Sequence, residues 1–188
     1  MLSRSTDVEF TPRADLTFRP SSLGDGVRYE RDIGTDSAAT FAFRLTHHTD
    51  CFIVESGDKI VHSSWVARER AFVGEIGKYF LPPPRSAYIY ECYTRPEMRG
   101  QGIYPYALAG IASELRSGGI EELWIGVDAS NGSSRRSIQK AGFEIRFEIA
   151  YSRRFGRLTV DLSGVTMPKG GKISDDPPRV AESQQCEQ

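Results

Sequence analysis

The sequence predicts an α/β domain with a mixed, mostly antiparallel central sheet and flanking helices. Three observations support this class. Runs rich in β-branched and aromatic residues alternate along the chain with helical patterns, as in α/β proteins. Two such runs flank Gly57 and Asp58, a turn pair that favours an antiparallel hairpin. In the second half helices separate the strands, which indicates βαβ crossovers.

Length and composition fit one domain with loose ends. The chain has 188 residues, 39% hydrophobic and 26% charged, enough for a core without disulfides or metals. We expect a flexible N-terminus over residues 1–12, a folded domain over 13–165 and a disordered tail over 166–188, which is rich in Pro, Gly, Ser and charge. The net charge of −1 gives no electrostatic reason to expect nucleic-acid binding.

Cysteine usage and hydropathy indicate the compartment. Cys51, Cys92 and Cys186 are odd in number and far apart, which argues against a disulfide framework. No run reaches the roughly 20 apolar residues of a membrane span, and the first residues lack the apolar segment of a secretory signal. No set of His, Asp and Cys has metal-ligand spacing, so we expect no metal. A cytoplasmic protein is the expectation.

The first half of the domain contains short strands around one clear helix. Leu16 and Phe18 belong to a first strand. Residues 36–46 are expected to form an amphipathic helix, with Thr35 or Asp36 as its N-cap, because apolar residues recur there at helical spacing. The hairpin around Gly57 follows, and a further strand-like segment ends at the three prolines of residues 82–84.

The second half alternates more regularly. Residues 87–94 read as an aromatic strand, and a helix begins near residue 104 with Pro105 in its first turn. Residues 123–128 are a short apolar run typical of a buried strand. The segment 129–142 is a second helix closed by Gly142, and residues 143–152 and 157–163 form the last strands.

The turn between the aromatic strand and the helix reads RPEMRGQGIY, residues 95–104. Gly100 and Gly102 let the backbone turn sharply and let a ligand approach bare N–H groups, while the helix start and Arg99 favour an anion such as phosphate. A plain strand-to-helix turn is the alternative. A dinucleotide fingerprint is excluded because its third glycine would fall on Pro105, and a P-loop because no Gly-Lys-Ser/Thr follows.

Two motifs together resemble a known family. The stretch P-E-x-R-G-x-G-I at 96–103 is followed by a buried strand and then by N-x-x-S-x-x-x-I-x-K-x-G-F at 131–143. This pairing resembles the acetyl-CoA-dependent N-acetyltransferases of the GNAT superfamily. The resemblance is strongest over 87–143, and the order of elements extends it to about 15–162.

The resemblance implies a GNAT-like acyl-CoA-binding fold and a reaction. It implies transfer of acetyl from acetyl-CoA to a primary amine on a small molecule, an amino sugar or a protein, by direct attack in a ternary complex. A homodimer is compatible with this. The alternative is a non-catalytic acyl-CoA-binding sensor or regulatory module. A third possibility is transfer of a longer acyl chain.

The resemblance also implies which residues bind the cofactor. Backbone amides from Arg99 to Tyr104 would cradle the CoA pyrophosphate, and the backbone of residues 92–94 would pair with the pantetheine arm. Asn131 would hydrogen-bond the same arm, and Ser134 lies one turn further on. The expected cofactor-binding residues are Cys92, Tyr93, Thr94, Arg99, Gly100, Gln101, Gly102, Ile103, Tyr104, Asn131 and Ser134.

Two positions depart from the family pattern. Tyr104 stands where the first motif usually ends in Gly or Ala, so its side chain must point away from the phosphates or the loop must sit differently. Ile138 stands where many relatives have a tyrosine that protonates the leaving thiolate, and isoleucine cannot donate a proton. The general acid is therefore unassigned, or the thiolate leaves unaided.

Glu91 is the candidate general base. In an apolar, aromatic strand its carboxylate would be partly desolvated, which strengthens it as a base, although a solvated glutamate or one paired with arginine is the alternative. A backbone N–H at Tyr93 or Thr94 would stabilise the oxyanion. The histidines are weaker candidates: those at positions 47 and 48 read as surface residues, and His62 is expected to face solvent.

Overall fold

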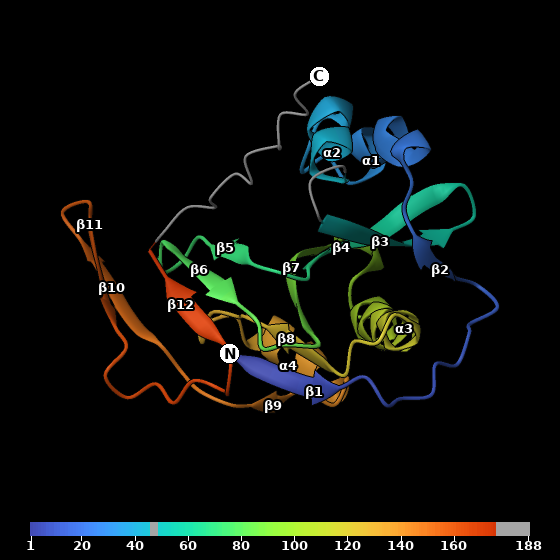
Figure 1. Cartoon of the computed structure of the whole chain (residues 1–188). Coiled ribbons are helices and arrows are strands. Elements are labelled where there is room, and N and C mark those ends of the chain that lie inside the picture. Colours follow the sequence, from blue (N-terminus) through green and yellow to red (C-terminus); the bar gives the residue numbers. More distant parts are fainter. Residues whose placement is uncertain (46–48, 176–188) are drawn as a thin grey trace, which may run out of the picture.

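The computed structural model describes residues 1–45 and 49–175 (Figure 1). Its central sheet has seven strands in the order β2-β3-β4-β7-β8-β1-β9, and β5, β6, β10, β11 and β12 form two smaller sheets. The strands are β1 (Leu2–Ser5), β2 (Thr17–Pro20), β3 (Thr49–Ser56), β4 (Lys59–Ala67), β5 (Ala71–Val73), β6 (Lys78–Leu81), β7 (Ser86–Thr94), β8 (Glu122–Ile125), β9 (Glu144–Ile145), β10 (Ala150–Arg154), β11 (Arg157–Asp161) and β12 (Lys172–Ser174). The α-helices are α1 (Gly26–Asp32), α2 (Ala38–Leu45), α3 (Ile103–Ser117) and α4 (Gly132–Lys140).

Only β7 and β8 pair in parallel within the central sheet, so the predicted mixed, mostly antiparallel class is confirmed. The parallel pair needs a crossover, which α3 supplies. The predicted hairpin is present as β3 and β4 around Gly57, whose φ of 56° suits a glycine. Helix α1 and strand β5 were not foreseen.

Helices cover both faces of the sheet (Figure 1). One apolar cluster joins α3 and α4 to the sheet through residues such as Leu108, Ile111 and Ile138. A second cluster joins α1 and α2 to the opposite face and centres on Tyr29, Phe41 and the buried indole of residue 65. The protein is therefore a three-layer domain with its core on both sides of the sheet.

The N-terminus is part of this sheet. Strand β1 lies between β8 and β9, where Leu2 pairs with Ile125 on one side and with Ile145 on the other. Leu2 and Ser3 are buried. The prediction of a loose segment over residues 1–12 is therefore wrong for residues 2–5, because β8 offers an open edge that this segment fills.

The C-terminal part differs from the prediction as well. The strand predicted over 143–152 is divided into β9 and β10, and β10 pairs with β11 in a separate hairpin that projects from the body (Figure 1). Strand β12, at residues 172–174, pairs with β6, so the predicted disorder of 166–188 is wrong at that point. Residues 176–188 lie outside the described part of the chain, as do the histidines at positions 47 and 48.

The sheet opens where β7 and β8 separate. Their pairing runs from Ser86 opposite Glu122 to Ile89 opposite Ile125, and β7 then continues to Thr94 without β8. On its other side, the pairing of β7 with β4 shifts register near Glu91, whose φ is 47°. A bulge of this kind turns the bulged strand and re-aims its side chains. We call this opening between β7 and β8 the splay.

Candidate functional site

A cavity of about 610 Å³ lies on the α3 and α4 face of the splay. Tyr93 and Gln101 do not line it: Tyr93 packs toward α1 and α2, and the Gln101 amide donates to the Glu97 carbonyl oxygen at 3.2 Å. The other expected cofactor-binding residues all line it: Cys92, Thr94, Arg99, Gly100, Gly102, Ile103, Tyr104, Asn131 and Ser134. We call this cavity the cofactor cleft.

The glycine loop has the conformation that the sequence predicts. Gly100 and Gly102 have φ values of 77° and 74°, which ordinary residues rarely adopt. Gly102 is the N-cap of α3, so the first N–H groups of this 15-residue helix face the cleft end without intrahelical partners. Arg99 turns back along the loop and donates from Nε to the Thr94 carbonyl oxygen at 3.0 Å. The loop therefore presents backbone donors and the positive end of a helix dipole.

Asn131 serves first as a helix cap. Its Oδ1 accepts a hydrogen bond from the Ser134 backbone N–H at 3.1 Å, which fixes the start of α4 beside the cleft. The side-chain nitrogen of Asn131 can then donate a hydrogen bond to a ligand. Ser134, one turn into the helix, lines the same wall.

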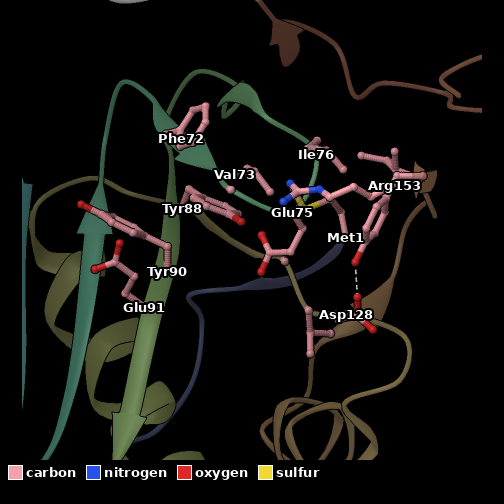
Figure 2. Close-up of a pocket in the computed structure, with 15 residues that line it drawn as sticks. Met1, Phe72, Val73, Glu75, Ile76, Tyr88, Tyr90, Glu91, Asp128 and Arg153 are labelled. Atoms are coloured by element: carbon pink, nitrogen blue, oxygen red, sulfur yellow. Dashed lines mark hydrogen bonds between the residues drawn. The ribbon is translucent and has the colours of Figure 1, made fainter. Parts of the chain in front are cut away.

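A second cavity of about 640 Å³ lies on the other side of the splay (Figure 2). We call it the acceptor cavity, after the role that we propose for it below. Its walls come from the β5–β6 turn, β7, the segment after β8, and β10. Tyr88 and Tyr90 form an aromatic wall, and the Glu75 carboxylate projects between Tyr88 and Asp128. The cavity therefore combines apolar surface with carboxylates.

Glu91 lies at one end of the acceptor cavity (Figure 2). Its side chain is 58% exposed, and its Oε2 accepts from Arg44 Nη1 at 2.7 Å. The expectation of a desolvated carboxylate is wrong, because the bulge turns this side chain out of the strand's packed face. The alternative of an arginine-paired glutamate is the one observed. Arg44 itself is packed, with its guanidinium carbon 3.8 Å from the centre of the Trp65 ring.

Asp128 lies at the opposite end. Hydrogen bonds from the Ser130 side chain, from the Tyr151 hydroxyl and from the Ser130 backbone N–H lower the pKa of Asp128 to about 2. The carboxylate is therefore ionised throughout the physiological range. Arg153 on β10 is the cation that lines this end. Tyr151 and Arg153 bring the β10–β11 hairpin to the cavity wall.

A buried polar chain runs beneath the cofactor cleft. His62 is fully buried, so the expectation that it faces solvent is wrong. Its Nδ1 lies 2.7 Å from Thr94 Oγ1 and its Nε2 lies 2.8 Å from Ser64 Oγ, which in turn donates to Cys92 Sγ at 3.2 Å. The Ser64 hydroxyl proton is used in the hydrogen bond to Cys92, so Ser64 Oγ accepts a hydrogen bond from His62 Nε2–H. His62 Nδ1 then carries no proton and accepts a hydrogen bond from the Thr94 hydroxyl. These contacts tie Thr94 and Cys92, both in the segment expected to pair with the cofactor, to β4.

Burial lowers the pKa of His62 to about 3, so stability should fall on acidification. The unfolded histidine gains a proton near pH 6.5 while the folded one stays neutral. For the wild-type protein, the free energy of unfolding should fall by up to about 1.4 kcal/mol per pH unit between pH 6.5 and about 3 because of this histidine. We expect His62→Gln, which keeps hydrogen-bonding capacity, to lack this part of the fall. Denaturant unfolding at pH 7.5, 6 and 5 measures it. Equal slopes for the variant and the wild-type protein would contradict this assignment.

The two departures from the family pattern take definite positions. Ile138 is 1% exposed and belongs to the α3 and α4 core, so it has no place in the cleft. The Tyr104 side chain leaves the loop toward β4 and β7, where its ring centre lies 5.5 Å from that of His62. Its hydroxyl lies near the Cys92 sulfur.

Within residues 1–45 and 49–175, no group of His, Cys, Asp and Glu could hold a metal ion. Over the same ranges, none of the helices has both the length and the apolar character that crossing a bilayer requires. Cys51 and Cys92 are free thiols.

Residues 27–143 match the sequence model of the acetyltransferase (GNAT) family. No curated protein matches the chain. Among solved structures, an aminoglycoside N-acetyltransferase in complex with CoA is 14% identical, with a TM-score of 0.58 over 73% of this chain and 98% of that one. The ribosomal-protein-S18-alanine N-acetyltransferase from Escherichia coli is 18% identical, with a TM-score of 0.53 over 74% and 83%. An aminoglycoside 6′-N-acetyltransferase from Acinetobacter baumannii is 12% identical, with a TM-score of 0.56 over 74% and 97%.

Proposed function

Because the chain belongs to the acetyltransferase (GNAT) family, we propose that it moves an acetyl group from acetyl-CoA to a primary amine by direct attack in a ternary complex. One observation carries the proposal. Cys92 lines the cofactor cleft and its neighbour Glu91 lines the acceptor cavity. The two cavities therefore lie on opposite sides of β7 at the splay, reached from adjacent residues of the strand. A donor in the cleft would deliver its thioester between the strands to an amine on the other side.

The cofactor cleft suits CoA in its chemistry. The loop from Arg99 to Tyr104 offers backbone donors for the pyrophosphate, and the end of β7, which has no β8 partner, offers backbone groups on that side to the pantetheine amides. A backbone N–H at Tyr93 or Thr94 would stabilise the oxyanion of the tetrahedral intermediate. Lys140, at the end of α4, also lines the cleft and supplies a cation there.

The acceptor cavity suits an amine. An ammonium group would be attracted by Glu75 and Asp128, and Glu91 would take its proton directly or through water before attack. Arg44 holds Glu91 in place. The similar structures include an aminoglycoside acetyltransferase and a ribosomal-protein-S18-alanine N-acetyltransferase, so amino sugars and protein amines belong in the first panel of acceptors.

The test is release of free thiol from acetyl-CoA over a panel of amines, with the acetylated product identified by mass. Amine-dependent release would support the proposal. Tight CoA binding without turnover on any amine would instead favour a non-catalytic acyl-CoA-binding module, the second candidate. That candidate rests on Ile138, which leaves α4 without the tyrosine acid of many relatives.

Glu75 offers a test of the acceptor side. It is exposed and has no hydrogen bond or ion pair within the described residues, so its charge is free to attract a cation. We expect Glu75→Gln to raise KM for a cationic amine by about three- to tenfold with little change in kcat. The reason is that the attraction between one partly solvated carboxylate and an ammonium group contributes about 1 kcal/mol to binding. Steady-state kinetics at low salt measure it.

Glu69→Gln is the matched control, since Glu69 is also exposed but lines neither cavity. The control should leave KM for the amine unchanged. If both substitutions raised KM for the amine equally, the cause would be the change in overall charge, and Glu75 would have no specific role in binding the acceptor.

A further inference from the structure

The leaving thiolate needs a proton, and the described residues suggest where one comes from. Ile138 cannot supply it, because it is apolar and packed in the core. Within the cofactor cleft, Tyr104 brings a phenol to the splay, where its hydroxyl meets Cys92. Cys92 is the residue next to Glu91 on β7, so this hydroxyl lies on the cofactor side of the strand, opposite the Glu91 end of the acceptor cavity.

The surroundings of Cys92 indicate whether a thiolate is stable at this place relative to a protonated thiol. Burial raises the pKa of the Cys92 thiol, although the Ser64 hydroxyl donates a hydrogen bond to its sulfur and the Tyr104 hydroxyl lies near it. Sulfur at this place therefore prefers to keep a proton. A CoA thiolate released beside it would meet the same surroundings. Unaided departure would be unfavourable, and protonation during C–S cleavage would lower the barrier.

Tyr104 is positioned to hold that proton until it is needed. Burial raises the pKa of its phenol well above the usual value, so the hydroxyl stays protonated at neutral pH. The ring is fixed from two sides, by His62 at 5.5 Å between ring centres and by the α3 core cluster. The hydroxyl lies near a sulfur, that of Cys92, and sulfur is the element that a bound thioester would bring.

We propose that the Tyr104 hydroxyl is the general acid that protonates the departing CoA thiolate, taking the place of the α4 tyrosine. This rests on the proposed acyl transfer. The amine, whose ammonium proton has already passed through Glu91 to solvent, forms a bond from its nitrogen to the thioester carbon and gives a second proton to Glu91. The C–S bond breaks, and the sulfur receives the Tyr104 proton. The phenolate regains a proton from solvent after CoA leaves, and Glu91 returns its own to solvent, so the step is balanced.

The experiment compares Tyr104→Phe with Tyr106→Phe in the full-length protein. Tyr106 lies two residues further along α3, and its hydroxyl makes only a long bond of 3.5 Å to the Leu16 carbonyl oxygen. We expect Tyr104→Phe to lower kcat by at least about tenfold with the CoA dissociation constant changed by less than about twofold, because only a proton donor is lost. Tyr106→Phe should leave kcat unchanged.

A third variant separates proton donation from structure. Cys92→Ala removes the partner of the Tyr104 hydroxyl but keeps the hydroxyl itself. Its loss of kcat should be clearly smaller than that of Tyr104→Phe. An equal loss, or a Tyr104→Phe enzyme with wild-type kcat, would overturn the role of Tyr104 alone. Absence of turnover by the wild-type protein on every amine would instead overturn the proposed function, and this inference with it.

Discussion

Replacing Gly102 by aspartate is expected to weaken CoA binding by at least about 100-fold, the largest effect on binding that we foresee. Gly102 lines the cofactor cleft and caps α3 with a φ of 74°. A carboxylate there would stand among the backbone donors of the loop and repel a pyrophosphate at short range, which amounts to several kcal/mol at low effective dielectric. Calorimetric titration with CoA measures the change.

Gly119→Asp is the matched control for this substitution. Gly119 has a φ of 81°, has open space around its Cβ position and lies at the far end of α3. The free energy of unfolding should fall by a similar amount, about 1 kcal/mol, in both variants. The cause is the same in each: a residue other than glycine must adopt a left-handed backbone conformation. Only Gly102→Asp should lose CoA. Normal CoA binding by Gly102→Asp would remove the loop from the cofactor site.

Glu91→Gln is expected to lower kcat by about 100-fold at neutral pH, because the amide cannot take the proton of the attacking amine. Glutamine can still accept from Arg44, so the position of the side chain should be kept. CoA binding should stay within about twofold of wild type. Steady-state kinetics with a saturating amine, paired with titration of CoA, measure both quantities.

Glu121→Gln controls for the loss of an exposed, ion-paired glutamate. Glu121 is 61% exposed and pairs with Arg85 at 2.7 Å, away from either cavity. Its replacement should leave kcat unchanged. If Glu91→Gln also retained full turnover, the amine would lose its proton without this carboxylate, and Glu91 would have no role as the base.

The parts of the fold that local sequence encodes were predictable. Helix α3 follows from apolar spacing and a proline start, and the β3–β4 hairpin from its turn pair around Gly57. Strand β1 was not, because four residues carry too little pattern and the pairing of Leu2 with Ile125 spans most of the chain. The same reason hid β12, whose partner β6 lies about ninety residues away in sequence.

The candidate site also has one part that local sequence predicts and one part that it does not. The cofactor cleft follows a contiguous motif, so its glycines were identifiable from the sequence. The acceptor cavity collects Glu75, Asp128 and Tyr151 from three separate segments, and none of them belongs to a motif. Glu91 was identified for its place in the strand, but the bulge that exposes it depends on register with β4 and has no local signal.

The most direct measurement is a crystal structure of the protein with CoA bound. We expect the pyrophosphate to accept hydrogen bonds from backbone N–H groups of residues 99–104, and the pantetheine arm to run along residues 92–94. The sulfur should reach the splay beside Cys92 and Tyr104 and point toward Glu91 in the acceptor cavity. A CoA molecule bound outside the cleft, or one whose sulfur points away from the acceptor cavity, would contradict acyl transfer across the splay.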